Sequence, residues 1–141
     1  MLAADYARTY RANAILTASP AQLVLLLYDG VLKSLMLARE AFERPEDDPR
    51  RVEAINTHLL KAQTIIAELQ GGLNHEAGGE FASTMQRLYD YHGRRLFEAN
   101  MRKQLEPIVE VERLFTDLRD AWAEMLGRQE GTPVEAGRAR A

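Results

Sequence analysis

The sequence predicts an all-α protein: an up-and-down antiparallel four-helix bundle with a short N-terminal leader segment. Four long segments repeat apolar residues at helical spacing, and none shows the alternation typical of a half-buried strand. Because the links between these segments are short, consecutive helices are expected to lie side by side and antiparallel. The prolines lie between the segments or at their starts, and they are Pro20, Pro45, Pro49, Pro107 and Pro133.

The first long helix is predicted to begin just after Ser19. The sequence Ser19-Pro20-Ala21-Gln22 has the form of a capping box, with proline at the first helical position. Apolar residues continue at helical spacing as far as Phe42, and the helix is expected to end before Pro45. Asp29-Gly30 is also a hairpin-turn pair, but its flanks are continuous rather than alternating, so the helix is preferred.

Proline and glycine also bound the other three helices. The second is predicted from near Asp48-Pro49 to Gly71-Gly72, the third from about Glu80 to Asn100, and the fourth from near Pro107 to Gly127. Residues 73–79 are predicted to form a loop. The second and fourth helices alternate spacings of three and four between apolar residues, as a bundle seam does: Val52, Ile55, Leu59, Ala62, Ile66 and Leu69, and Ile108, Val111, Phe115, Leu118, Trp122 and Met125.

The chain therefore divides into a leader at 1–16, a helical bundle at 17–127 and a tail at 128–141. The leader carries Tyr6 and Tyr10 one helical turn apart, which gives it an apolar side that can pack on another surface. The tail combines glycine, proline and charges with a single large apolar residue, Val134, and is predicted to be disordered.

Composition excludes several classes of function. The 141 residues include 18 Lys and Arg and 21 Asp and Glu, so the net charge is −3, whereas nucleic-acid-binding proteins are normally basic. The chain has no cysteine, and its three histidines do not show a metal-binding spacing, so we expect no metal, no cofactor and no catalysis. The longest apolar run extends only from Leu23 to Tyr28, too short to insert in a membrane.

The first helix carries more apolar surface than one core face requires. On a helical wheel that starts at Leu23, the usual core face is extended on one flank by Leu25, Leu32 and Met36, and on the other flank by Leu26. A helix that is apolar nearly all round must be covered nearly all round. Two explanations stay open, namely coverage by the protein's own helices and leader, or an apolar groove that binds a partner.

Gly30 sharpens this question because a glycine within a helix costs about 0.5–1 kcal/mol relative to alanine. Its presence indicates that another backbone comes close at this point. Together with Ser34 and Ala41, Gly30 forms a row of small residues suited to receiving a helix. That helix is either one of the protein's own or a partner's.

Several motifs in the chain resemble those of a known family. Tyr10, Asn13, Leu16-Thr17-Ala18-Ser19-Pro20 and Leu23-Val24-Leu25-Leu26-Leu27-Tyr28-Asp29-Gly30 resemble the opening of the flagellar secretion chaperones for flagellin. Later segments are similar to the same family over roughly residues 6–125, among them Leu88-Tyr89-Asp90-Tyr91 and Leu118-Arg119-x-Ala121-Trp122. The linker from Met101 to Pro107 lacks the aspartate that usually helps to start the family's last helix.

The resemblance implies a chaperone of the bacterial cytosol that holds the C-terminal segment of flagellin. Such a chaperone prevents premature polymerisation and, with the client bound, assists delivery to the flagellar type III export gate. Combined with the wheel, this gives a set of candidate partner-binding residues: Tyr10, Ile15, Leu16, Leu23, Leu25, Leu26, Gly30, Leu32 and Met36. The alternative is a homo-oligomeric structural or adaptor protein, such as a homodimer, whose second copy covers the same surface.

Overall fold

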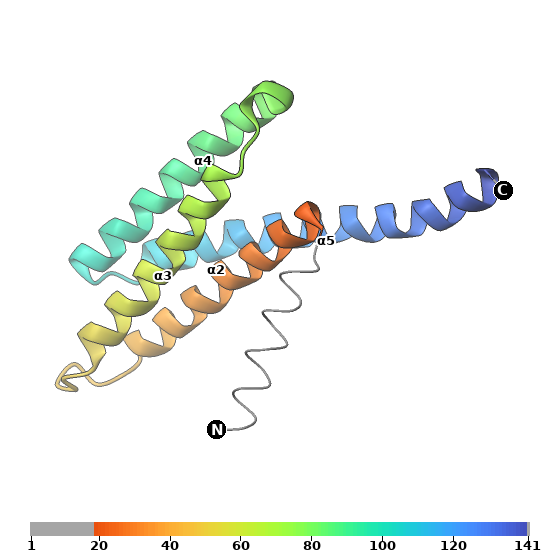
Figure 1. The fold of residues 1–141 in the computed structure, drawn as a ribbon. Helices are drawn as coiled ribbons and strands as arrows, with labels where there is room; N and C mark the ends of the chain where they lie inside the picture. The colour runs from red at the N-terminus through yellow and green to blue at the C-terminus, as the bar shows by residue number, and fades with distance from the viewer. Residues whose placement is uncertain (1–18, 141) are drawn as a thin grey trace.

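The computed structural model describes residues 19–140 and the side chains of residues 19–128. Within this part of the chain there are four helices and no strand: α2 (Pro20–Phe42), α3 (Arg51–Gly71), α4 (His75–Arg102) and α5 (Glu106–Arg140). Each helix runs back alongside the one before it, and α2 also packs on α5, which closes the bundle (Figure 1). The predicted all-α four-helix bundle is therefore confirmed.

The capping box predicted at the start of α2 is present. The Gln22 N–H donates to Ser19 Oγ at 3.2 Å, and the Ser19 N–H donates to Gln22 Oε1 at 2.9 Å. Two backbone donors that would otherwise be free at the helix end are thus satisfied. The helix ends at Phe42, as the sequence indicates.

The prediction that residues 73–79 form a loop is wrong for most of that segment. The Asn74 side chain accepts a hydrogen bond from the Ala77 N–H at 3.0 Å, and α4 begins at the next residue, His75. A kink follows at Gly79, whose φ of 50° is a conformation that favours glycine. The sequence did not indicate this short helical turn, because a glycine-rich stretch is typical of a loop.

The predicted end of the last helix at Gly127 is also wrong, because α5 continues to Arg140. A glycine that ends a helix often does so in the left-handed conformation of a C-terminal cap, and Gly127 does not take that conformation. Disorder of the tail at 128–141 stays a prediction.

The core is centred on aromatic side chains from three helices. Phe115 of α5 is completely buried, and its ring lies 5.8 Å from that of Tyr28 on α2 and 6.2 Å from that of Tyr89 on α4. The hydroxyls of the two tyrosines are 2.7 Å apart and satisfy each other inside the bundle. Aliphatic residues with no exposed surface surround this centre: Val31, Leu35, Ile55, Leu59, Leu96, Ile108 and Val111.

Helix α2 is long and apolar enough, by length and composition alone, to cross a membrane. Its apolar residues have another role in the bundle, because Tyr28, Val31, Leu35 and Ala38 are buried against the other helices. A core helix passes the same test as a membrane span, so we interpret α2 as the core helix of the bundle.

Candidate functional site

The candidate residues of α2 lie on two different sides of the helix. Leu32 and Met36 line a groove between α2 and α5, opposite Val109, with a volume of about 660 Å³. Met36 is 42% exposed and Leu32 is half-buried. Leu25 is half-buried and lies seven residues before Leu32, hence on the same side of the helix.

Charged residues form the rim of this α2–α5 groove. Arg39 of α2 pairs with Glu112 of α5 at 2.9 Å in the lining of the groove, and outside that lining Asp29 of α2 pairs with Arg119 of α5 at 2.8 Å. Both pairs are partly exposed, so each contributes little to stability. They bridge the two helices beside an apolar strip, an arrangement common to surfaces that bind an amphipathic helix.

Of the other candidates on α2, Gly30 lies toward α3. A Cβ added to Gly30 would lie 3.1 Å from Cδ1 of Ile65, so the close approach is made by a side chain of the protein's own α3 and not, as predicted, by another backbone. Leu23 is half-buried and Leu26 is 40% exposed. The remaining candidates, Tyr10, Ile15 and Leu16, lie outside the described residues.

A deeper apolar pocket, which sequence reasoning missed, opens at the end of the bundle where α2 begins. Its volume is about 370 Å³, in the range of small-ligand pockets. All four helices contribute apolar side chains to it, among them Val24, Leu27, Leu69, Met85 and Trp122. The Trp122 Nε1–H donates to the backbone oxygen of Ala21 at 2.7 Å, which fixes the start of α2 at the edge of the pocket.

A third apolar surface lies between α3 and α4 and was also missed. Ile66 and Ala67 of α3 and Phe97 of α4 line a groove of about 270 Å³. Phe97 is 56% exposed, and Leu60 of α3 is 49% exposed. The signal was present in the sequence: Leu96 is a core residue, so Phe97, rotated by 100° around the helix, has to lie outside the core.

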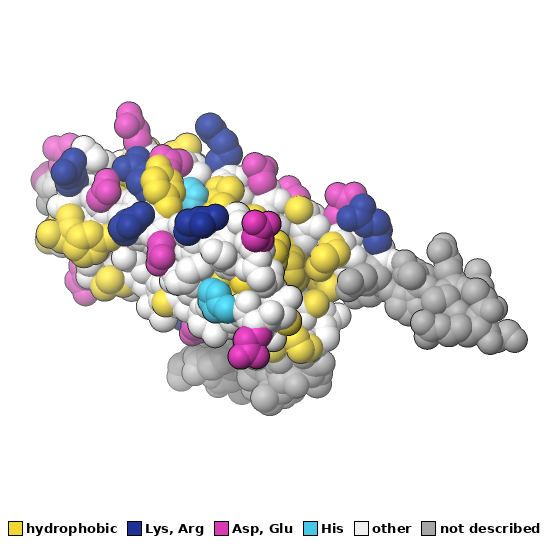
Figure 2. Space-filling model, turned by 90° about the horizontal axis from the view of Figure 1, so that it is seen from above, with side chains coloured by type: hydrophobic (Ala, Val, Ile, Leu, Met, Phe, Trp, Pro, Cys, Tyr) yellow, Lys and Arg dark blue, Asp and Glu magenta, His cyan; other side chains and the backbone are white. Residues whose placement is uncertain are grey.

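Exposed hydrophobic side chains therefore form several patches on the surface. Figure 2 shows yellow hydrophobic patches between the blue and magenta charged side chains on one face of the molecule. The exposed large hydrophobic residues on α3 and α4 are Val52, Leu60, Phe81, Tyr91, Phe97 and Met101. Such patches, rimmed by charge, are typical of interaction surfaces.

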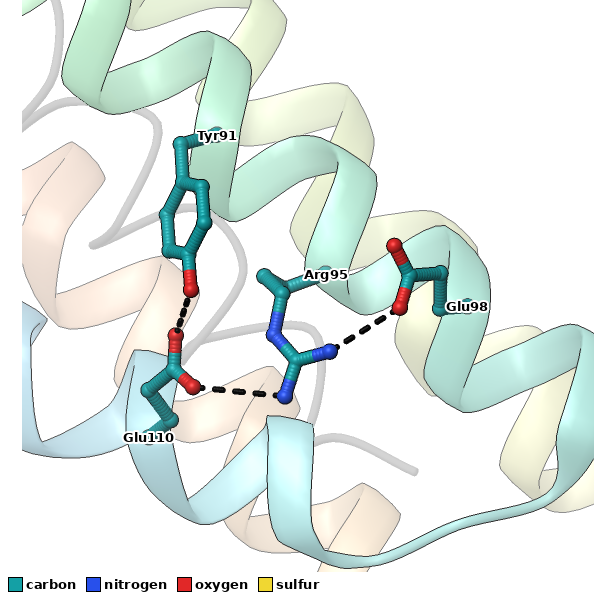
Figure 3. Close-up of polar contacts among 4 residues, drawn as sticks. All are labelled: Tyr91, Arg95, Glu98 and Glu110. Atoms are coloured by element: carbon teal, nitrogen blue, oxygen red, sulfur yellow. Dashed lines mark hydrogen bonds and ion pairs between the residues drawn. The ribbon is translucent and has the colours of Figure 1, made fainter.

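A polar cluster joins α4 to α5 on another side of the bundle (Figure 3). Glu110 accepts a hydrogen bond from the Tyr91 hydroxyl at 2.7 Å and pairs with Arg95 at 3.3 Å, while Arg95 also pairs with Glu98 at 2.9 Å. The hydrogen bond from Tyr91, aided by Arg95, lowers the pKa of the Glu110 carboxyl, and the same bond raises the pKa of Tyr91. The cluster is a clamp between two helices.

His92 is buried beside this clamp. Its ring lies edge-on to that of Phe115 at 6.2 Å, and among the described residues nothing hydrogen-bonds its buried Nδ1. Burial, as the largest effect, lowers the pKa of His92 below its ordinary value of 6.5. The folded protein therefore favours the neutral imidazole, and we interpret His92 as a core residue rather than a catalytic base.

We expect the stability of the bundle to fall as the pH decreases from 7.5 to 5.5. Unfolding restores the ordinary pKa of His92, so the unfolded chain binds a proton more readily, and stability is lost as the pH falls below 6.5. Thermal melts at several pH values measure this as a drop in Tm of a few degrees. His92→Gln should flatten the dependence, whereas the control His58→Gln should not, and equal slopes for both variants would contradict the assignment to His92.

The described residues contain no group of three or more His, Asp or Glu side chains placed to hold a metal ion. His58, His75 and His92 lie on different parts of the bundle, on α3, at the start of α4 and within α4. The geometry instead offers apolar grooves on a helical scaffold, which is a means of binding another chain.

Comparison with known proteins decides the family. A family model described as flagellar protein FliS matches residues 2–129, which is nearly the whole chain. The chain belongs to the FliS family. It is 42% identical over 117 residues to the flagellar secretion chaperone FliS of Bacillus subtilis (strain 168), covering 83% of each chain.

Two further FliS chaperones show similar agreement. The chain is 39% identical to that of Salmonella typhimurium over 121 residues, covering 85% of this chain and 86% of the relative. It is 35% identical to that of Escherichia coli (strain K12) over 122 residues, covering 86% of both chains. This FliS-family chain is therefore a flagellar export chaperone and not an enzyme.

Proposed function

We propose that this chaperone binds the disordered C-terminal segment of flagellin in the bacterial cytosol, prevents its premature polymerisation and assists its delivery to the flagellar type III export gate. The observation that carries the proposal is the α2–α5 groove, in which Leu32 and the exposed Met36 face Val109 between charged rims. Membership of a family of flagellar secretion chaperones supports the same function.

The shape of this surface suits a client that folds as it binds. Leu25, Leu32 and Met36 make an apolar strip along about three turns of α2, which matches the apolar stripe of an amphipathic helix. A disordered segment loses conformational entropy when it orders, so it needs an extended apolar surface to offset that cost. The α3–α4 groove and the end pocket add such surface.

The leader at 1–16 is proposed to cover part of this apolar surface when no client is bound. Two residues separate it from Ser19, and α2, which begins at the next residue, lines the end pocket with Val24 and Leu27. Its apolar residues Tyr10, Ile15 and Leu16 are the candidates for this contact. A client that displaces the leader has to bury more apolar area than the leader does, because the leader's own apolar side chains then return to water.

Calorimetric titration of the full-length protein with a peptide of the flagellin C-terminal segment tests the proposal. We expect binding with a Kd in the micromolar range or tighter and a negative heat-capacity change from apolar burial. A peptide of equal length from the middle of flagellin is the control and should not bind. Absence of detectable heat with the C-terminal peptide at two well-separated temperatures would rule out that segment as the client.

The same sample separates the chaperone from a homo-oligomeric adaptor. Light scattering coupled to size exclusion should give a protomer mass of 15.9 kDa for the free protein and a one-to-one complex with the peptide. A stable dimer that the peptide does not disturb would instead favour a second copy as the cover of the apolar strip of α2, which includes the exposed Met36.

A further inference from the structure

Three carboxamide side chains on α3 form a ladder along the seam with α4. Asn56, Gln63 and Gln70 are spaced by seven residues, so they lie on the same side of the helix. At one end of the ladder, Asn100 of α4 donates through Nδ2 to Asn56 Oδ1 at 2.7 Å. At the other end, Gln70 donates through Nε2 to Asp90 Oδ1 at 2.5 Å and to the backbone oxygen of Gln86 at 3.5 Å.

The middle carboxamide has no such partner. Oε1 of Gln63 is buried, and no donor among the described residues reaches it. In the antiparallel register that places Asn56 opposite Asn100 and Gln70 opposite Gln86, the residue opposite Gln63 is Gly93. Glycine has no side chain with which to complete the pair. A buried acceptor without a donor is rare in folded proteins and calls for an explanation.

Gly93 also leaves space at this point rather than letting α3 come closer. A Cβ added to Gly93 would meet no atom of a neighbouring element within 4 Å, in contrast to Gly30, where Ile65 already fills the space. Gln63 and Gly93 line the same α3–α4 groove, together with Ile66, Ala67 and Phe97. The groove thus combines an apolar wall, a gap over a glycine and an unpaired carboxamide.

We propose that the α3–α4 groove receives a helix of the client and that an Asn or Gln side chain on that helix enters the gap over Gly93 to pair with Gln63. The proposal rests on the proposed function and names the chemistry by which this groove recognises its client. The client's Asn or Gln takes the place of the side chain that α4 lacks at Gly93. Apolar residues beside it on the client helix pack against Phe97 and Ile66.

Carboxamide chemistry fits this position better than charge. A carboxamide both donates to Oε1 and accepts from Nε2 of Gln63, so one side chain can satisfy both atoms. A carboxylate cannot donate, and it would lose its hydration in an apolar groove. A lysine or arginine of the client would approach Arg94, which lines the same groove and is found in no ion pair of the described residues.

Two variants at Gly93 and one at Gln63 distinguish an effect on client affinity from an effect on the stability of the bundle. Gly93→Asn supplies the missing rung within the chain, so Tm should rise while affinity for the flagellin C-terminal peptide falls roughly tenfold, the scale of one lost hydrogen bond and its desolvation. Gly93→Ala gives a larger gain in helix propensity than Gly93→Asn but adds no hydrogen-bonding group, so Tm should rise with affinity changed less than about twofold. Gln63→Leu should leave Tm unchanged or higher and lower affinity roughly tenfold.

The test is calorimetric titration of the full-length variants with that peptide, with Tm measured on the same samples. Substituting each Asn and Gln of the peptide in turn should then identify one position whose effect disappears in Gln63→Leu. Unchanged affinity in both Gly93→Asn and Gln63→Leu, with the wild type binding normally, overturns the inference and leaves the proposed function standing. A wild-type protein that does not bind the peptide overturns both.

Discussion

Replacing Phe115 with alanine is expected to lower the free energy of unfolding by about 3–5 kcal/mol, the cost typical of a large aromatic residue lost from a core. Phe115 is completely buried, and its ring contacts those of Tyr28, Tyr89 and His92 from two other helices. The cavity would therefore open where α2, α4 and α5 meet. Since a domain of this kind is stable by about 5–15 kcal/mol in total, the loss should remove a large fraction of its stability.

Urea denaturation of the two proteins measures this difference. The matched control is Phe97→Ala, which removes the same ring from a position that is 56% exposed, and it should cost less than about 1 kcal/mol. Equal losses in the two variants would show that Phe115 is not the centre of the core.

Replacing Met36 with aspartate is expected to weaken binding of the flagellin C-terminal peptide by at least about thirtyfold, which corresponds to about 2 kcal/mol. Met36 is 42% exposed in the α2–α5 groove, so the free protein should tolerate the charge. In the complex that carboxylate would be covered by an apolar client face without a partner, which is costly. Leu32→Asp and Leu25→Asp should act in the same direction but also destabilise the fold, because both side chains are half-buried.

Val52→Asp is the matched control for Met36→Asp. Val52 is 56% exposed near the start of α3 and lines none of the three apolar surfaces described above. Affinity should therefore stay within about twofold of the wild type. If Met36→Asp, with an unchanged melting curve, also bound the peptide normally, the assignment of the client to the α2–α5 groove would be wrong.

The sequence was sufficient to predict the architecture. The periodicity of the apolar residues indicated the core face of each helix. The capping box of Ser19 and Gln22 indicated the start of α2, because it depends on only four consecutive residues. The same local reasoning failed at His75, because the cap made by Asn74 lies within a glycine-rich stretch. It also failed at Gly127, where the absence of a left-handed turn lets α5 continue.

The surfaces were harder to predict because they depend on the register between helices. The wheel indicated that Leu32 and Met36 lie outside the ordinary core face of α2, but not that Val109 of α5 faces them. The wheel did not decide whether a partner or one of the protein's own helices packs against Gly30. In the structure, Ile65 of α3 packs against it. The unpaired Gln63 opposite Gly93 becomes visible only when α3 and α4 are aligned, since each helix alone shows nothing unusual.

The central claim is that a foreign chain covers the apolar strip of α2, and methyl NMR of the methionines tests it most directly. With the flagellin C-terminal peptide bound to protein labelled at the methionine methyl groups, the Met36 signal should shift and show nuclear Overhauser effects to peptide protons. A saturated complex in which the Met36 methyl keeps its free-state shift and shows no contact with the peptide would contradict the account.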